Sequence, residues 1–240
     1  MIIAKFVSVI ILGYLLGSIP FGLLISRRKA SVDVRDYGSG RTGATNVLRT
    51  AGRKAAAAVG TLDLLKGTLA VVFAGLIVSG EYLVVGNFGL GTLVAQVLAA
   101  LAAVAGHIWP IFLKFRGGRG VATFFGGLVA LCPPAALFGG EVMIIGAGLT
   151  RYVSLGSIAG AVGTYTILVP LTIMNGFPIE YLVYCLIGTV IVIVMHRDNI
   201  GRLLSGKERR LGEKVEINNS PAATTYKGST LEAPDTGNQR

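Results

Sequence analysis

The amino-acid sequence predicts an all-α, polytopic integral membrane protein of about seven transmembrane helices, with the N-terminus outside and the C-terminus in the cytoplasm. Apolar residues make up 52% of the 240 positions and charged residues only 14%, whereas about a quarter of the residues of a soluble protein are charged. Several apolar runs approach the ~20 residues that span a bilayer. We therefore expect a membrane-embedded domain over residues 1–214 and a disordered cytoplasmic tail over residues 215–240.

Seven apolar runs are the expected spans. They cover residues 3–26, 56–79, 83–105, 120–136, 138–150, 157–174 and 179–195. The fourth and fifth runs are short, so they form either one long span or two spans that meet near Cys132-Pro-Pro134 and Gly139-Gly140. Proline disrupts the interior of a helix, which favours two spans.

The distribution of Lys and Arg also favours seven spans over six. With seven spans, the loops at 27–55, 106–119, 151–156 and 196–214 share one side and contain most of the basic residues. The opposite loops, near 80–90, 133–141 and 175–180, contain Glu81, Glu141 and Glu180 and no Lys or Arg. Six spans would place Arg151 and the basic C-terminal segment outside. Since basic loops stay in the cytoplasm, seven spans fit better, with Lys5 as an exception.

The formal net charge of +10 is also explained by the membrane. Basic nucleic-acid-binding proteins have a similar excess, but membrane proteins concentrate Lys and Arg in their cytoplasmic loops. We therefore expect contact with membrane lipid and no binding of nucleic acid.

Four polar, glycine-rich segments interrupt the apolar chain, and seven spans place all four on the same side. They are residues 38–49, 106–120, 153–157 and 196–200. Glycine allows backbone N–H groups to approach an anion closely, and Arg supplies charge. The combination predicts a phosphate site at the membrane surface.

The first segment is the richest in phosphate-binding groups. Ser39, Thr45, Asn46 and Arg49 provide hydroxyls, an amide and a guanidinium. Its Gly-Ser-Gly-Arg-Thr-Gly run formally matches the dinucleotide-binding pattern, but that pattern needs a preceding strand, and a membrane helix precedes it here. We predict an interfacial helix over residues 44–53; the alternative is a flexible loop.

The second segment places Gly117, Gly118, Arg119 and Gly120 at the start of a span. N–H groups at a helix N-terminus bind anions, although the Gly-Lys-Ser/Thr ending of a Walker A loop is absent. His107 is equally compatible with packing and with function.

Asp63 and Lys66, spaced i, i+3 near the cytoplasmic start of a span, predict a structural ion pair, with support of the site as the alternative.

The last two segments supply hydroxyls, an imidazole and an amide. Ser154 and Ser157 are expected either to cap a helix or to join the site. His196 and Asn199, spaced i, i+3, share one helix face, and His196 is the best candidate for a base, with helix capping as its alternative. His196-Arg-Asp lacks the later Asn of the kinase catalytic loop, since residue 203 is Leu.

Taken together, these segments resemble the PlsY family of bacterial acyl-phosphate:glycerol-3-phosphate acyltransferases over residues 8–212. The matching motifs are Gly38-Ser-Gly-x-x-Gly-Ala-Thr-Asn46-x-x-Arg49-x-x-Gly52, Asp63-x-x-Lys66-Gly67, Gly106-His107-x-x-Pro110-x-Phe112-x-x-Phe115-x-Gly117-Gly118-x-Gly120-Val121-Ala122-Thr123, Ser154-Leu-x-Ser157 and His196-Arg-x-Asn199-Ile200-x-Arg202-Leu203. The chain departs from the family at two positions: Arg41 stands where the family usually has Asn, and Arg119 where it has Lys.

The resemblance implies a seven-helix enzyme of the bacterial inner membrane whose active site faces the cytoplasm. Such an enzyme transfers a fatty acyl group from acyl phosphate, not acyl-CoA, to the sn-1 hydroxyl of glycerol 3-phosphate, giving lysophosphatidic acid and phosphate. This is the first acylation step of phospholipid synthesis. We expect no cofactor and no metal, and contact with an enzyme that makes acyl phosphate is possible.

The resemblance also assigns roles to the residues above. Catalytic roles are expected for His196, Asn199, Ser154 and Ser157, which would orient the glycerol hydroxyls. Substrate binding is expected for Ser39, Thr45, Asn46, Arg49, His107, Gly117, Gly118, Arg119 and Gly120. Within that second set, Ser39, Arg49 and Arg119 would bind the glycerol 3-phosphate anion. Thr45 and the backbone from Gly117 to Gly120 would bind the acyl phosphate head.

Two other classes of protein compete with this interpretation. Acyltransferases with a His-x4-Asp motif are excluded, because Phe112 follows His107 at that spacing and Gly201 follows His196. A transporter for phosphorylated metabolites is the alternative from another class. It would place polar groups near mid-membrane, whereas this chain keeps them at the ends of its spans.

Overall fold

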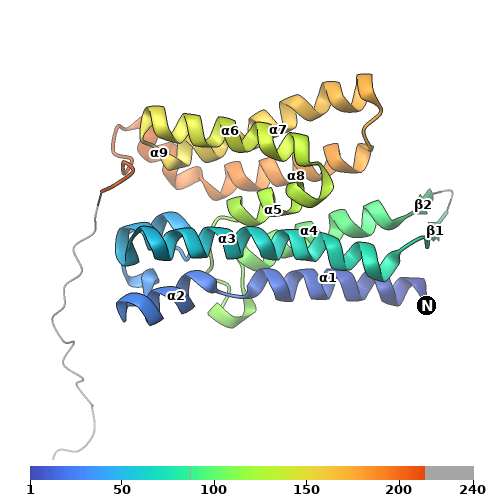
Figure 1. Cartoon of the computed structure of the whole chain (residues 1–240), viewed down its shortest axis with the longest axis horizontal. Helices are drawn as coiled ribbons and strands as arrows, with labels where there is room; N and C mark the ends of the chain where they lie inside the picture. Colours follow the sequence, from blue (N-terminus) through green and yellow to red (C-terminus); the bar gives the residue numbers. More distant parts are fainter. Residues whose placement is uncertain (87, 214–240) are drawn as a thin grey trace, which may run out of the picture.

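The computed structural model describes residues 1–86 and 88–213, which form a bundle of helices running back and forth along one axis (Figure 1). The α-helices are α1 (Ile2–Ser18), α2 (Phe21–Ala30), α3 (Ala44–Val78), α4 (Thr92–Ile108), α5 (Val121–Leu131), α6 (Pro133–Thr150), α7 (Val153–Asn175), α8 (Ile179–Met195) and α9 (Arg197–Leu204). Shorter elements are the 3₁₀ helices η1 (Val34–Asp36) and η2 (Ile111–Leu113) and the strands β1 (Leu83–Val85) and β2 (Phe88–Leu90). The tail predicted for residues 215–240 lies outside the described residues.

The first predicted span, 3–26, is broken in the middle. Helix α1 ends at Ser18 and α2 begins at Phe21, after Ile19 and Pro20. Proline has no N–H and restricts the residue before it to extended conformations, so the helix stops there. Helix α2 then reaches the basic run Arg27-Arg28-Lys29 in its last turn.

The start of the third predicted span is wrong. Residues 83–90 do not extend a helix; they form an antiparallel hairpin in which Leu83 pairs with Leu90, and α4 begins at Thr92. Gly86 has φ +60°, a conformation that glycine adopts at little cost. Hydropathy alone does not distinguish an apolar hairpin from the end of an apolar helix.

Residues 121–150 form two helices, as the prolines suggested. The break lies at Cys132, whose φ and ψ are −146° and 81°, and Pro133 opens α6. The glycines at 139 and 140 lie inside α6 and do not end it. Helix α5 has 11 residues, which corresponds to about 17 Å of helix. It is therefore shorter than a ~30 Å hydrocarbon layer.

The prediction of a helical, multi-span membrane protein is confirmed. Within residues 1–86 and 88–213, 5 helical segments are long and apolar enough to cross a membrane. Helices α8 and α9, bent by 58° at His196, make a sixth if they count as one span.

Helix α5 lies between two layers of helices. In Figure 1, α1, α3 and α4 lie on one side of it and α6, α7 and α8 on the other. Phe124 and Leu128 of α5 are fully buried, and the Phe124 ring stacks on Tyr184 of α8 with centroids 5.4 Å apart. The Tyr184 hydroxyl donates to the Phe124 carbonyl at 3.0 Å. A short apolar helix is thus stable here because protein surrounds it.

Glycines allow the helices to approach each other closely. A Cβ at Gly13 or Gly17 of α1 would overlap the α4 carbonyls of Ala99 and Ala103, and a Cβ at Gly67 of α3 would overlap α5. Helix pairs in membranes associate through such small residues, because apolar side chains gain little by leaving lipid.

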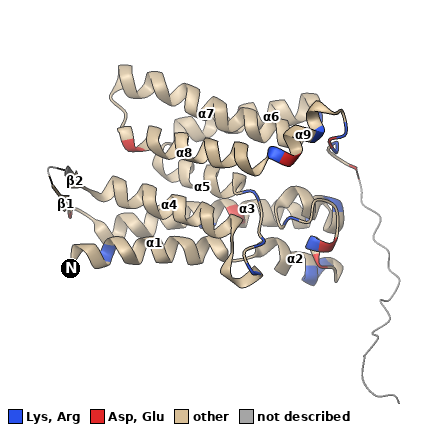
Figure 2. Ribbon diagram, turned by 180° about the vertical axis from the view of Figure 1, so that it is seen from behind, with Lys and Arg blue, Asp and Glu red and all other residues tan. Residues whose placement is uncertain are grey.

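Basic and acidic residues gather at one end of the bundle, around α2, α9 and the loops beside them (Figure 2). The opposite end holds the N-terminus and the β-hairpin (Figure 1). There Lys5 forms an ion pair with Glu81. The polar segments singled out in the sequence therefore lie toward the same end.

The close approach of α3 and α5 gives a stability test. Replacing Gly67 with Ala should destabilise the protein by about 1–3 kcal/mol, because the added methyl overlaps the Thr123 carbonyl and lies 3.0 Å from Gly127 N. The measurement is the midpoint of thermal unfolding in detergent.

The matched control is Gly60→Ala in the same helix. A Cβ there meets only Ala44 Cβ, at an ordinary 3.7 Å, and alanine has the higher helix propensity. We expect the Gly60 variant to be at least as stable as the parent. Equal midpoints for the two variants would contradict the packing argument.

Candidate functional site

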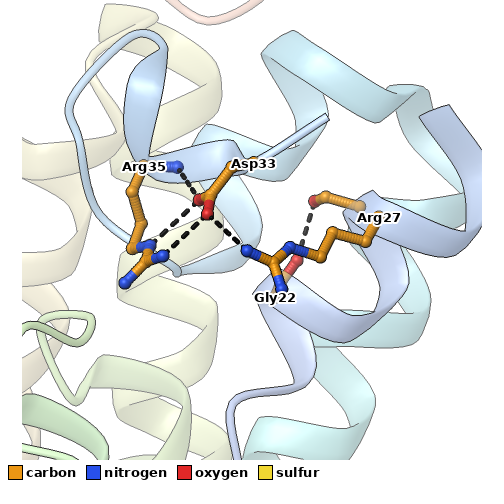
Figure 3. A network of polar contacts seen from close by, with 5 residues as sticks. Gly22, Arg27, Asp33 and Arg35 are labelled. Carbon is orange, nitrogen blue, oxygen red and sulfur yellow. Dashed lines mark hydrogen bonds and ion pairs between the residues drawn. The ribbon is translucent and has the colours of Figure 1, made fainter. Parts of the chain in front are cut away.

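The loop between α2 and α3 is folded around two side chains, Asp33 and Asn46. Figure 3 shows the first of these. Asp33 accepts hydrogen bonds from the Arg35 backbone N–H at 3.0 Å, from Arg35 Nε at 2.9 Å and from Arg27 Nη2 at 3.0 Å. The hydrogen bonds from Arg35 hold the pKa of Asp33 well below its usual range. Both arginines are therefore engaged by the protein itself.

Asn46, in the first turn of α3, organises the glycine-rich part of this loop. Its buried Nδ2 donates to the carbonyls of Val34, Tyr37 and Arg41 at 2.8, 3.0 and 2.9 Å, and its Oδ1 accepts from Ser39 N at 3.0 Å. The amide is fully used by the loop. Asn46 therefore anchors the loop, and its expected role as a substrate contact stays a prediction.

The second glycine-rich segment folds onto the end of α4. Gly117 N donates to the Ile108 carbonyl and Gly118 N donates to the His107 carbonyl, both at 3.1 Å. A Cβ at Gly118 would also overlap the His107 ring. The N–H groups of Gly117 and Gly118 thus point into the protein, and the expectation that they bind an anion is wrong. Glycine is needed at these positions for close contact.

Beneath both loops lies a buried group of charged side chains. Lys66 Nζ lies 2.8 Å from Asp63 Oδ1, which confirms the predicted ion pair, and His107 Nδ1 lies 3.4 Å from the same oxygen. Lys66 also donates to the Ile19 carbonyl at 3.3 Å, at the break between α1 and α2. This group ties together α3, α4 and the break in the first span.

The N-termini of three helices converge on a cavity of about 230 Å³. The lining residues are Ser39, Arg41, Gly43, Ala44, Thr45, Asn46 and Arg49 from the first loop and α3, Asp63, His107, Arg119, Gly120, Val121, Ala122 and Met143, and Val153 and Ser157 of α7. Ala44, Val121 and Val153 open helices α3, α5 and α7. The unpaired N–H groups and partial positive charge of a helix N-terminus favour anions.

A smaller cavity of about 20 Å³ adjoins the first. It shares Ser39, Thr45, Arg49, Arg119 and Val153 with the larger cavity, and adds Ser154, Asn199, Arg202, Glu208 and Arg209. A space of this size holds about one water or one hydroxyl group. It combines cationic side chains with an amide and a carboxylate.

Arg119 is the central cation of the site. It lines both cavities, and its Nε is buried without a hydrogen-bond partner in the described part of the chain. Burial, with repulsion from Arg41, lowers the pKa of Arg119 to about 10, so the side chain remains charged at neutral pH. An unpaired, buried guanidinium N–H is costly unless a ligand accepts from it.

Glu208 is the one acidic side chain of the smaller cavity. Its Oε1 accepts hydrogen bonds from Asn199 Nδ2 at 2.6 Å and Ser154 Oγ at 2.9 Å, and its Oε2 accepts from Arg202 Nε at 2.7 Å. Burial by itself would raise the pKa of Glu208, but the hydrogen bonds from Asn199, Arg202 and Ser154 outweigh it, so the pKa is lowered. Glu208 is therefore ionised at neutral pH.

Sequence reasoning missed Glu208, and it left Arg202 out of the site. Glu208 stands in the charged run from Lys207 to Arg210, which reads as a solvated surface segment. The C-terminal segment that carries Glu208 folds back to the start of α7. Just before α7, Leu211 N donates to the Arg151 carbonyl at 2.6 Å and Arg151 Nη2 donates to the Leu211 carbonyl at 3.2 Å. The only sequence signal for this part of the site was Arg202, which belongs to the quoted motif that begins at His196.

The structure brings most of the predicted site residues together. Ser39, Thr45, Arg49 and Arg119 line both cavities, Ser154 and Asn199 line the smaller one, and Asn46, His107, Gly120 and Ser157 line the larger one. The predicted helix from Ala44 is also present, and it meets the rest of α3 at a kink at Gly52. His196, Gly117 and Gly118 are not among the lining residues of either cavity.

Two predicted capping roles are not found. Tyr152 is the N-cap of α7, Ser154 donates to Glu208, and Ser157 Oγ donates to the Val153 carbonyl at 2.8 Å. His196 is buried at the bend between α8 and α9, and its side chain makes no cap hydrogen bond to α9. Its Nδ1 lies 2.8 Å from the Val192 carbonyl. Because a carbonyl only accepts, Nδ1 carries the proton, and Nε2 of the neutral ring is an acceptor.

Metal ligands do not cluster in the described residues: no group of three or more His, Cys, Asp or Glu side chains is placed to hold an ion there. The site as described is built from cations, hydroxyls, an amide and helix N-termini.

Comparison with known proteins places the chain in a family. The family model for glycerol-3-phosphate acyltransferase matches residues 7–206. Glycerol-3-phosphate acyltransferase 3 of Dehalococcoides mccartyi strain CBDB1 is 65% identical over 215 residues, covering 90% of this chain and 100% of that protein. The glycerol-3-phosphate acyltransferase of Thermoanaerobacter pseudethanolicus strain ATCC 33223 is 43% identical over 207 residues, covering 86% and 96%.

Two solved structures share the fold. The crystal structure of PlsY, an integral membrane glycerol 3-phosphate acyltransferase, in its glycerol 3-phosphate form has a TM-score of 0.74 and 38% identity, covering 86% of this chain and 96% of that one. Its lysophosphatidic acid form has a TM-score of 0.72 and 37% identity, covering 85% and 94%. With this coverage and identity, the chain belongs to the glycerol-3-phosphate acyltransferase family, of which PlsY is a member.

Proposed function

We propose that this protein transfers an acyl group from acyl phosphate to the sn-1 hydroxyl of glycerol 3-phosphate, giving lysophosphatidic acid and phosphate. Arg119 supports this most directly, because its buried Nε lacks a partner within the described residues and its side chain lines both cavities. Two phosphate-bearing substrates placed in these cavities would share one cation. The family membership supports the same reaction.

The two cavities suggest where each substrate binds. Glycerol 3-phosphate would place its phosphate near Ser39, Arg49 and Arg119, which line both cavities, and one hydroxyl in the smaller cavity near Ser154 and Asn199. Acyl phosphate would place its head in the larger cavity, near Thr45 and the start of α5 at Gly120. The free N–H groups of that helix N-terminus take the role first expected of Gly117 and Gly118.

Transfer at this site requires little chemistry from the protein. Acyl phosphate is a mixed anhydride, so the glycerol oxygen attacks the acyl carbon, the carbon–oxygen bond to phosphate breaks, and phosphate leaves with the bonding pair. The hydroxyl proton passes to a phosphate oxygen of a substrate, because His196 lines neither cavity. Positioning and electrostatic stabilisation supply the catalysis, which fits a site rich in Arg and without a covalent nucleophile.

A third hollow suggests where the acyl chain lies. It has a volume of about 260 Å³ and is lined by Trp109, by Val190, Ile191, Val194 and Met195 of α8, and by Arg41 and Arg197. Arg41 also lines the larger cavity, so the apolar hollow and the polar cavity are neighbours. We propose that the acyl chain occupies this hollow, beside the membrane, while the phosphate lies in the cavity.

The finer membrane topology is part of the same proposal. We propose seven crossings, in which α5 and α6 count as two joined at Cys132, with the N-terminus outside and the site and C-terminus in the cytoplasm. The gathering of charged residues at the α2 and α9 end supports this orientation (Figure 2). The location is the bacterial inner membrane. The enzyme that makes acyl phosphate would be a neighbour or a direct partner.

Reporter fusions test the orientation. A fusion after residue 86, in the β-hairpin, should report the outside, and a fusion after residue 215 should report the cytoplasm. The expected result is opposite signals in periplasmic and cytoplasmic activity assays. Both fusions on one side would overturn the topology and the shared cytoplasmic site.

Arg49 should contribute more to activity than Arg41. Losing one charge-assisted phosphate contact costs about 1.5–3 kcal/mol, so Arg49→Ala should lower kcat/KM for glycerol 3-phosphate roughly tenfold or more. Arg41→Ala is the matched control, because it removes the same charge from the larger cavity and the apolar hollow but not from the smaller cavity. Full activity of the Arg49 variant together with an inactive Arg41 variant would contradict the assignment.

The choice of donor tests the function as a whole. Purified protein should form lysophosphatidic acid from acyl phosphate and glycerol 3-phosphate, and should not form it from acyl-CoA with the same acyl chain. A chelator should have no effect. Robust transfer from acyl-CoA, or activity lost with chelator and restored by Mg²⁺, would refute the proposed reaction. Saturable glycerol 3-phosphate uptake into sealed vesicles without product would indicate a transporter.

A further inference from the structure

Asn199 is held in an unusual way for a residue that contacts substrate. One side of its amide, Nδ2, donates to Glu208 Oε1 at 2.6 Å. The other side, Oδ1, is buried and has no hydrogen-bond partner in residues 1–86 and 88–213. Asn199 is 4% exposed and lines the cavity of about 20 Å³. An unpaired buried acceptor is costly, so this oxygen is placed for a ligand donor.

Glu208 determines which side of the amide is free. A carboxylate only accepts hydrogen bonds, so at 2.6 Å it selects the NH₂ side of Asn199 and leaves Oδ1 toward the cavity. The same carboxylate accepts from Ser154 Oγ and from Arg202 Nε. The Ser154 hydroxyl therefore has its proton turned to Glu208 and its lone pairs available. Asn199 Oδ1 and Ser154 Oγ are therefore both available to accept a hydrogen bond.

We propose that Glu208 is a positioning residue for the acceptor substrate: it orients Asn199 and Ser154 so that both accept hydrogen bonds from a hydroxyl of glycerol 3-phosphate. This role rests on the proposed function, because it names which groups of that site meet the hydroxyl. Glu208 itself does not act as the base. It already accepts three hydrogen bonds, and it acts on the substrate through Asn199 and Ser154.

The position of Glu208 is itself fixed by the fold of the C-terminal segment. The backbone of Lys207 donates to the Arg202 carbonyl at 2.8 Å, and Leu211 is joined to Arg151 by two hydrogen bonds. Glu208 is 9% exposed. The carboxylate therefore has little freedom to leave Asn199, which is what a positioning role requires.

A reciprocal exchange of amide and carboxylate tests the proposal. Asn199→Asp alone sets two carboxylates against each other, and kcat/KM for glycerol 3-phosphate should fall at least about tenfold. The double variant Asn199→Asp with Glu208→Gln restores one donor facing one carboxylate, keeps the net charge and leaves an oxygen of residue 199 toward the cavity, while Ser154 loses the acceptor Oε1 that it shares with Asn199. It should recover part of the lost activity.

The kinetic pattern separates positioning from simple stability. The loss should fall on glycerol 3-phosphate, while the KM for acyl phosphate stays within about twofold, because the donor head lies in the other cavity. Asp198→Asn is the matched control: it removes one carboxylate from the residue next to Asn199, and that carboxylate is 63% exposed. This control should retain parental kinetics. Thermal unfolding midpoints in detergent establish that each variant is folded.

Two results would overturn the role of Glu208. One is a folded Asn199→Asp variant with parental activity. The other is a folded double variant that is no more active than Asn199→Asp. If Asn199→Asp does not fold, the folded double variant decides: activity within about tenfold of the parent supports the role, and lower activity refutes it. A parent protein that forms no lysophosphatidic acid would instead refute the proposed function, and with it this role.

Discussion

The buried carboxylate of Asp63 holds together the parts of the structure on which the site depends. It binds Lys66 at 2.8 Å, and Lys66 reaches the Ile19 carbonyl where the first span breaks. Asp63 also lies 3.4 Å from His107, whose carbonyl and ring support Gly118. Removing one partner of a buried ion pair typically costs about 3–5 kcal/mol. Both the broken helix and the second loop therefore depend on one charge inside α3.

The site lies next to this buried group. It needs several cations close together that carboxylates of the protein do not neutralise. Arg49, Arg119 and Arg202 line the smaller cavity with Arg209, and only one carboxylate, Glu208, lies among them. Two further carboxylates near the site are already paired: Asp33 with Arg27 and Arg35, and Asp63 with Lys66. Positive potential is thus left where two phosphates are expected. Preorganised charge of this kind stabilises a reaction without reorganisation at the moment of transfer.

The glycine-rich segments act mainly through packing, which differs from the phosphate loops they superficially resemble. The N–H groups of Gly117 and Gly118 are used by α4, and the loop before α3 is held by Asn46. The N–H groups available to an anion are instead those of the helix N-termini that these loops place at one cavity. The loops determine where helices α3, α5 and α7 begin, and the first turns of those helices face the cavity.

Sequence alone determined the class of the protein and singled out many of the residues that line the two cavities. Apolar length and charge distribution identify membrane helices because lipid tolerates few charges, and Pro133 marks the break before α6 because proline cannot continue a helix. Polar side chains such as Ser39, Arg49 and Asn199 stood out because an apolar chain seldom keeps them without a function. The start of α4 was missed because an apolar hairpin has the same hydropathy as a helix.

Tertiary structure alone decided what each polar group contacts. Asn46 and Asn199 are the same residue type, yet a loop uses the whole amide of Asn46, whereas Asn199 Oδ1 has no partner among the described residues, because their neighbours differ. Glu208 could not be identified within its charged run of sequence. Its role follows from its contact with Ser154 of α7, which lies 54 residues earlier in the chain. Spacing along a helix fixes which side chains share a face, but hydrogen-bond partners between distant segments are set only when the whole bundle is packed.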